Sequence, residues 1–237
     1  MQLVIDIGNT NVKVGYFHEM CLVDKKIFSS GFEGWENLLT SEVASAIVGG
    51  SGVIPIELLQ ISQAHGIPIH RFTPASKIPL TNAYETPETL GSDRIAGAVG
   101  ACEIFKDQPI LVIDSGTAIT YDLIVNKTFL GGNISPGMTL RFKALNQFTQ
   151  RLPLVSPPED IELYGKNTYE AIAYGVINGL VYEINQTIET FNQKYNNLKI
   201  IITGGDALYF VNKIKKTIFV EPNLVLIGLN RILKENV

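Results

Sequence analysis

Cysteines are scarce in this sequence, and basic residues are not in excess. Cys21 and Cys102 are its two cysteines, they lie far apart, and neither belongs to a CxxC pair. This spacing argues against a disulfide framework or a zinc finger and predicts two buried thiols in a reducing compartment. Lys and Arg number 19 against 23 Asp and Glu, for a formal net charge of -4. Without a basic surplus, nucleic acid is not an expected partner.

Long apolar runs are also missing. No stretch approaches the about 20 apolar residues that span a bilayer. Asp6 and Lys13 interrupt the apolar start, which lacks a basic segment followed by a small-residue cleavage site. We therefore expect no export signal and no membrane partner, and we predict a cytoplasmic protein.

Two common nucleotide-binding fingerprints are absent as well. The chain contains neither GxxxxGK[ST] nor GxGxxG, so it offers no support for a P-loop or a dinucleotide-binding fold. His18, His65 and His70 show no metal-ligand spacing, and we interpret them as structural. What remains is a chain of 237 residues, 46% hydrophobic and 18% charged, which can form one or two globular domains.

The two halves of the chain repeat one pattern of strands. Leu111–Gly116 matches Leu3–Gly8 at five of six positions, and each segment is followed by a turn and a second strand. A repeat predicts two lobes, residues 1–107 and 108–237, with a cleft between them. A buried-strand sequence that is common in many proteins is the alternative explanation. The expected strands are 3–17 as a hairpin, 25–29, 44–48, 68–72, 111–116, 119–125, 128–133, 198–203 and 217–221, and the expected helices are 56–65, 138–150, 169–194, one from residue 91, one from residue 206 and a closing one.

Each repeat places an aspartate near the end of a strand, just before a glycine turn. Asp6 precedes Gly8-Asn9-Thr10-Asn11, and Asp114 precedes Ser115-Gly116-Thr117. The N–H groups of such a turn can converge on an anion, and a divalent cation can lie between the carboxylate and a phosphate. The first turn is therefore a candidate Mg²⁺-nucleotide site, with Lys13 as a point charge for phosphate oxygens. A plain hairpin with an Asn-rich turn is the alternative.

The segment Leu90–Ala101 predicts a helix that begins with Gly91-Ser92-Asp93-Arg94 and continues with small residues, which allow close packing. Asp93 would lie in the first turn, where it either caps the helix or accepts a proton. Arg94 is not explained as a cap, and its charge suits an acidic substrate. Together they form a sensible pair for a kinase. Farther along, Thr168 precedes an apolar helix and is typical of an N-cap.

The set of motifs is similar to one family, the type III pantothenate kinases, also called the Bvg accessory factor family. The order and spacing of six motifs hold over essentially the whole chain. Ser92, Asn133 and Ser135 depart from the family pattern without replacing a proposed acid or base. The motifs are the DxGNT turn at Asp6–Asn11, GxDR at Gly91–Arg94, DxGTAxTxD at Asp114–Asp122, GGxIxPG at Gly131–Gly137, NTxxAIxxG at Asn167–Gly175 and TGGDA at Thr203–Ala207.

The resemblance implies an α/β fold with two ribonuclease H-like lobes, as in the acetate and sugar kinase, Hsp70 and actin superfamily. It implies a homodimer that phosphorylates pantothenate with ATP in coenzyme A biosynthesis, with Asp93 as the general base. Mg²⁺ would accompany ATP at Asp6, directly or through water, and Asp114 would bind K⁺ or NH₄⁺. The implied ATP ligands are Asp6, Gly8, Asn9, Thr10, Asn11, Lys13 and Thr117, and the implied pantothenate ligands are Tyr84, Gly91, Ser92, Asp93, Arg94 and Thr168.

Two other functions share some of these motifs. A sugar kinase of the same superfamily would carry similar phosphate turns, but the zinc-binding CxCGxxGC pattern of one large sugar-kinase group is absent. A non-catalytic ATP-binding regulator would keep the turns and lose the chemistry, and the presence of both Asp93 and Arg94 argues against it. The site residues together favour the pantothenate kinase.

Overall fold

The structure is a computed structural model that describes residues 1–50 and 52–237. The chain forms two compact units. Unit 1 contains Met1–Asp107, Ile124–Gly131 and Asn223–Val237, and unit 2 contains Gln108–Leu123 and Gly132–Pro222. Unit 1 thus includes two segments that follow residue 107 in the sequence, Ile124–Gly131 and Asn223–Val237.

Unit 1 is built on a five-stranded sheet with the order β3-β2-β1-β4-β5. The central strand β1 pairs antiparallel with β2 and parallel with β4. The strands of this sheet are β1 (Gln2–Ile7), β2 (Asn11–His18), β3 (Cys21–Ser29), β4 (Ser45–Gly49) and β5 (Ile69–Arg71), and the short β6 (Thr81–Asn82) pairs with β9 (Thr128–Pro136) of the other sheet instead. The helices are η1 (Trp35–Asn37), α1 (Ile56–His65), η2 (Pro87–Thr89), α2 (Ser92–Ile104) and α6 (Leu224–Asn236).

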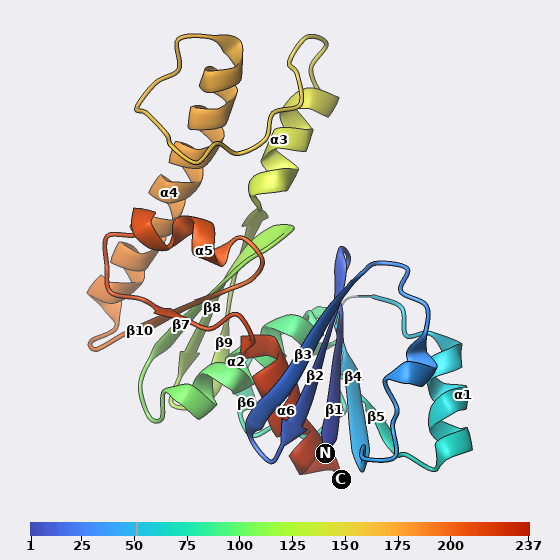
Figure 1. The fold of residues 1–237 in the computed structure, drawn as a ribbon. Helices are drawn as coiled ribbons and strands as arrows, with labels where there is room; N and C mark the ends of the chain where they lie inside the picture. The colour runs from blue at the N-terminus through green and yellow to red at the C-terminus, as the bar shows by residue number, and fades with distance from the viewer. Residues whose placement is uncertain (51) are drawn as a thin grey trace. The chain divides into compact units, whose positions relative to one another are not determined.

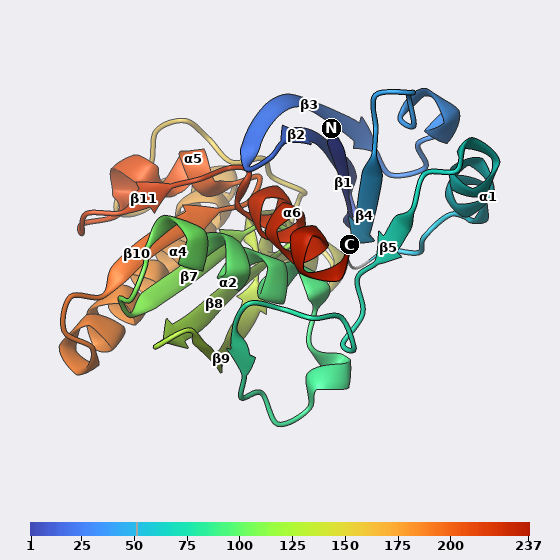
Figure 2. The same ribbon diagram turned by 90° about the horizontal axis from the view of Figure 1, so that it is seen from below.

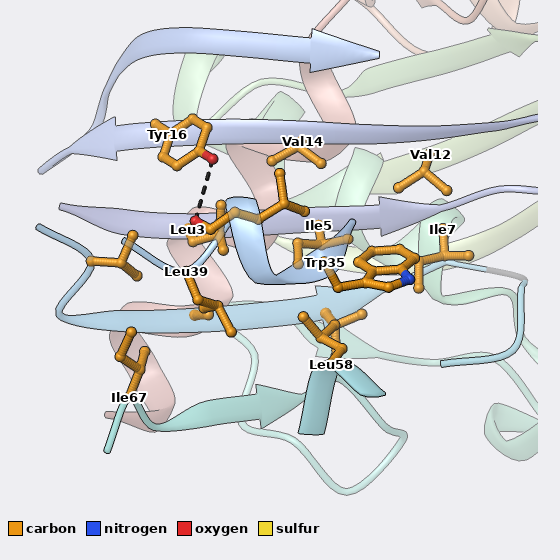
Figure 3. Packing of buried hydrophobic residues seen from close by; sticks show 14 residues of the cluster. Leu3, Ile5, Ile7, Val12, Val14, Tyr16, Trp35, Leu39, Leu58 and Ile67 are labelled. Carbon is orange, nitrogen blue, oxygen red and sulfur yellow. Dashed lines mark hydrogen bonds between the residues drawn. The ribbon is translucent and has the colours of Figure 1, made fainter. Parts of the chain in front are cut away.

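Both faces of β1 are covered, which explains its uninterrupted apolar sequence. Leu3 and Ile5 belong to a core cluster that includes Trp35, and Figure 3 shows these side chains on one side of the sheet. Val4 alternates to the other face and is also fully buried. The Tyr16 hydroxyl in this cluster donates a hydrogen bond to the Leu38 carbonyl oxygen at 3.3 Å.

Helices α2 and α6 cross at glycines. A Cβ atom on Gly228 would lie 1.7 Å from the Ala96 carbonyl oxygen, and one on Gly100 would lie 2.3 Å from the Leu224 carbonyl oxygen. Figure 2 shows the two helices side by side, and α6 also contacts β1, β2 and β4. The small residues of α2 therefore serve close packing, as predicted, and they hold the C-terminal helix in unit 1.

Unit 2 repeats the sheet of unit 1 with different helices. The second sheet has six strands in the order β11-β10-β7-β8-β9-β6. Its first five strands correspond to β5-β4-β1-β2-β3, and both β10 pairings are parallel, as both β4 pairings are. The predicted internal repeat is thus confirmed. The end of β8 and the start of β9 fall in the Ile124–Gly131 segment of unit 1. The elements, drawn in Figure 1, are β7 (Ile110–Ser115), β8 (Ala118–Val125), β9 (Thr128–Pro136), α3 (Met138–Gln147), α4 (Thr168–Lys194), β10 (Lys199–Thr203), α5 (Ala207–Phe210), η3 (Val211–Lys213) and β11 (Phe219–Val220).

One sequence expectation about the thiols is wrong. Cys21 is exposed, because it begins the edge strand β3, while Cys102 on α2 is half-buried. Burial raises the pKa of the Cys102 thiol to about 11. No helix in residues 1–50 or 52–237 is both long enough and apolar enough to cross a membrane.

Candidate active-site residues

The first candidate site is the turn between β1 and β2. Asp6 lies near the end of β1, is 8% exposed, and stands opposite Lys13 in the strand register. The Gly8 N–H donates to the Asn11 carbonyl oxygen at 3.0 Å, which closes a tight turn. Residues 9–11 are exposed at its tip. Unit 1 therefore places together all the predicted ATP ligands of the first motif.

Two glycines that follow β4 contact the backbone of this turn. Gly50 has a φ of 112°, and a Cβ atom there would lie 2.3 Å from the Ile7 carbonyl oxygen. The Gly52 N–H donates to the same oxygen at 2.8 Å. Ile7 lies between Asp6 and Gly8, so Gly50 packs directly against the backbone of the turn. Any residue with a side chain would be strained at position 50.

Unit 2 has the same arrangement at the second turn. Asp114 is half-buried near the end of β7, and Thr117 is exposed. Gly204 has a φ of 95°, and a Cβ atom there would lie 2.3 Å from the Ser115 carbonyl oxygen. The Asp206 N–H donates to that oxygen at 2.9 Å. Both turns are therefore supported by a positive-φ glycine and by the N–H group two residues later.

A further glycine packs against the second turn. A Cβ atom on Gly137 would lie 2.1 Å from the Gly116 carbonyl oxygen, and the Gly137 N–H donates to the Thr117 carbonyl oxygen at 3.1 Å. At the Gly204–Asp206 loop, which also contacts this turn, burial raises the pKa of the Asp206 carboxyl above its ordinary value. The second turn is thus enclosed by two glycine loops.

Asp93 lies in the first turn of α2, but it is not the N-cap. Gly91 occupies that position, and no side chain makes a capping hydrogen bond there. The Asp93 Oδ1 atom accepts the Arg94 N–H at 2.9 Å, and a Cβ atom on Gly91 would lie 2.5 Å from that oxygen. A glycine at position 91 therefore leaves room for the carboxylate.

Ser92 joins the start of α2 to the end of β4. Its hydroxyl donates to the Gly50 carbonyl oxygen at 2.8 Å and lies 2.9 Å from the Gly50 nitrogen, whose N–H it accepts. Since Gly50 rests on Ile7, the segment that carries Asp93 and the turn that follows Asp6 are connected within unit 1. The sequence had indicated a substrate contact for Ser92 and no role for Gly50.

Arg94 and Tyr84 lie together in unit 1. The Arg94 side chain is buried, with its guanidinium 5.6 Å from the Tyr84 ring centroid and 5.7 Å from the Phe129 ring centroid. The Tyr84 ring lies over Gly131, where a Cβ atom would be 3.7 Å away. The two ring centroids are themselves 6.1 Å apart, so the guanidinium makes cation–π contacts with two adjoining rings.

Thr168 is the first residue of α4 and is exposed. The N-cap is Asn167, whose side chain accepts the Glu170 N–H at 3.0 Å. The expectation that Thr168 caps the helix is therefore wrong, which leaves its hydroxyl without a capping role. Thr168 belongs to unit 2, together with Asp114 and Thr117.

The sequence contained a signal for the missed glycines Gly50 and Gly52. Residues 45–52 of unit 1 align with residues 199–206 of unit 2 when the two strand registers are superposed. In that alignment Gly50 corresponds to Gly204, which the TGGDA motif already contained. Extending the repeat past the hairpins would have identified the support of the first turn.

Known proteins resemble this chain over its length. The family model described as type III pantothenate kinase matches residues 2–190. A relative of that name from Bacteroides fragilis is 42% identical over 244 residues, covering 100% of this chain and 98% of the relative. Another from Christiangramia forsetii is 39% identical over 240 residues, covering 100% and 99%.

Solved structures share the fold. A Baf family protein of Campylobacter jejuni has a TM-score of 0.65 at 24% identity and covers 98% of both chains. A ROK hexokinase from Thermus thermophilus has a TM-score of 0.51 at 12% identity and covers 97% of both chains. These likenesses confirm the predicted α/β fold, and the sequence matches show that the chain belongs to the type III pantothenate kinase family.

Proposed function

We propose that the protein phosphorylates pantothenate with ATP to give 4'-phosphopantothenate, the first step of coenzyme A biosynthesis. Relatives at about 40% identity are named for the kinase activity. The observation that carries the proposal is the placement of Asp93 in unit 1. Ser92, its neighbour, bonds Gly50, and Gly50 rests on the turn that follows Asp6. The candidate base and the candidate phosphate turn are thus connected through Ser92 and Gly50 within unit 1.

In-line phosphoryl transfer asks a protein mainly for positioning and charge neutralisation. Asp93 would accept the proton of the pantothenate hydroxyl, and the room left by Gly91 allows its carboxylate to adopt that position. Arg94 would bind the pantothenate carboxylate, with Tyr84 and Thr168 as further contacts. The burial of this guanidinium against Tyr84 and Phe129 supports this role, because a desolvated positive charge binds an anion strongly.

The two turns would bind Mg²⁺-ATP, with contacts from Asp6, residues 8–13 and Thr117. Among the described residues no group of three or more His, Cys, Asp or Glu side chains could hold a metal ion. This fits Mg²⁺, which is commonly held by one or two carboxylates, substrate phosphates and water. Asp6 is such a carboxylate, and the ion would neutralise charge on the transferred phosphoryl group. Asp114 would bind K⁺ or NH₄⁺ near the second turn.

A coupled assay of ADP release tests the proposal. The full-length protein is supplied with Mg²⁺-ATP and K⁺, and with pantothenate, a panel of hexoses or no acceptor. We expect ADP release that depends on pantothenate alone. Release stimulated by a hexose would favour a sugar kinase, and nucleotide binding without turnover on any acceptor would favour a non-catalytic regulator.

We also propose a cytoplasmic homodimer. The small residues of α2 do not support it, because α6 covers them within unit 1. The support comes from unit 2, where large apolar side chains on α3, α4 and the segment between them are exposed. They are Leu140, Phe148, Leu154, Leu163, Tyr164, Tyr169 and Tyr182. Sedimentation at micromolar concentration should show a dimer, and a fully active monomer would contradict it.

A further inference from the structure

Four side chains of unit 2 form a polar network at the end of β9. Arg141 on α3 and Glu183 on α4 form an ion pair. Glu183 also accepts hydrogen bonds from the Tyr121 hydroxyl at 2.9 Å and from the Ser135 hydroxyl at 3.3 Å. Arg141 Nη2 donates to Ser135 Oγ at 3.0 Å. One guanidinium and one carboxylate therefore connect two strands with two helices.

The network contributes more to geometry than to stability. The side chains of Arg141 and Glu183 are 22% and 28% exposed, and ion pairs that water reaches contribute about 1 kcal/mol or less. Burial, and then the negative charge of Glu183, raise the pKa of the Tyr121 phenol, which therefore remains a hydrogen-bond donor. The fork of Arg141 holds several acceptors at fixed angles, which a flexible ammonium cannot do.

The same arginine reaches the loop that packs on the second phosphate turn. Its Nε atom donates to the Pro136 carbonyl oxygen at 2.8 Å, and its backbone N–H donates to the Gly137 carbonyl oxygen at 3.0 Å. The Gly137 N–H donates to the Thr117 carbonyl oxygen, and its Cα lies directly against Gly116. An unbroken series of contacts thus runs from Glu183 to the turn.

We propose that Arg141 and Glu183 are positioning residues for the nucleotide. They fix the Pro136–Gly137 peptide, which fixes the backbone of the turn that carries Thr117. This inference rests on the proposed ATP contact at Thr117. Phosphate-binding groups stabilise a bound anion only when they are held in place before it arrives. Loss of the network should therefore weaken nucleotide binding and leave the unit 1 residues Asp93 and Arg94 unaffected.

The test compares three variants of the full-length protein. Arg141→Lys keeps the charge but loses the fork that reaches Pro136 and Glu183 together, and Glu183→Gln removes the negative charge. Glu189→Gln is the matched control, because Glu189 also lies on α4 and forms a 3.1 Å pair with Lys216 outside the network. The readouts are the Kd of a fluorescent ATP analogue with Mg²⁺ and no pantothenate, the KM of each substrate and the Tm.

We expect both network variants to raise the Kd of the analogue and the KM for ATP about tenfold, the effect of losing one hydrogen bond to a charged group. The KM for pantothenate and the values of the control should stay within about twofold. Unchanged nucleotide Kd values, or equal rises in both KM values with a fall in Tm, would overturn the inference. So would a wild-type protein that binds no analogue. The proposed function fails by a different result, namely nucleotide binding without pantothenate-dependent ADP release.

Discussion

The two units build a glycine turn in the same way but support it with different elements. In each unit a strand ends near an aspartate, and a positive-φ glycine from the neighbouring parallel strand supports the next carbonyl group. The pairs are Gly50 with Ile7 and Gly204 with Ser115. In unit 1 the connection from β3 to β4 contains only η1, whereas in unit 2 the connection from β9 to β10 contains α3 and α4.

This difference separates the features that both units share from the features that only one unit has. The duplicated sheets make two glycine turns of the same build, because the hairpin and the supporting glycine are local to each sheet. The inserted helices of unit 2 add Gly137 and the Arg141 network to one of them. Unit 1 instead carries Asp93, which has no counterpart in the repeated strand pattern. The predictions below test this division.

The largest effect is expected at Asp93, which has no counterpart in unit 2. Asp93→Asn keeps the shape of the side chain and removes the proton acceptor, so kcat should fall by about 10²- to 10⁴-fold while ATP binding persists. Arg94→Gln should instead raise the KM for pantothenate. Steady-state kinetics and the Tm of the same samples decide the matter. An Asp93→Asn protein with normal kcat and reduced Tm would show that Asp93 serves the helix only.

Replacing the positive-φ glycine that supports each turn should destabilise both units equally. Gly50→Ala and Gly204→Ala each force a side chain into a positive-φ position against a carbonyl oxygen, at a cost of about 2 to 4 kcal/mol. Gly66→Ala is the control, because Gly66 has a φ of 65° and nothing lies within 4 Å of its added Cβ. That change should cost about 1 to 2 kcal/mol. Denaturant unfolding measures all three, and a large loss in one unit alone would break the equivalence.

The two aspartates should respond to different cations. Asp114→Asn should reduce the stimulation of turnover by K⁺ over Na⁺ by about tenfold, because an amide lacks the charge that holds the cation. Asp6→Asn should leave that ratio unchanged and shift the Mg²⁺ dependence. Rates in matched chloride salts at several Mg²⁺ concentrations test both. Equal rates of the wild type in K⁺ and Na⁺ would remove the proposed role of Asp114.

The smallest effect concerns Asp206, which occupies the position of Gly52 in the repeat. Burial raises its pKa in the folded protein, so the folded state binds protons more tightly than the unfolded state. Its carboxyl group therefore lowers stability as the pH rises through that pKa. Asp206→Asn should increase the free energy of unfolding by about 1 kcal/mol or less at pH 7 and have no effect near pH 3. A benefit of the same size at both pH values would contradict this.

Strands, most helices and the repeat could be predicted because their signals are local. The run Leu3-Val4-Ile5 is buried on both faces of a central strand, and such strands have continuous apolar sequences. The end of the helix predicted over 138–150 was less accurate, since α3 stops at Gln147. Helix ends depend on the loops that follow them, which the apolar pattern does not describe.

The sequence by itself determined where most strands lie along the chain, the two aspartate-glycine turns and the motifs of the family, because apolar patterns and turn chemistry depend on neighbouring residues. Only the tertiary structure decided what supports these turns. Ser92 bonds Gly50 across 42 residues of sequence, and Glu183 bonds Arg141 across 42 residues. No pattern in one strand or helix pairs side chains so far apart. Their partners are set by the packing of whole elements, which becomes defined only when the sheet and its helices are assembled.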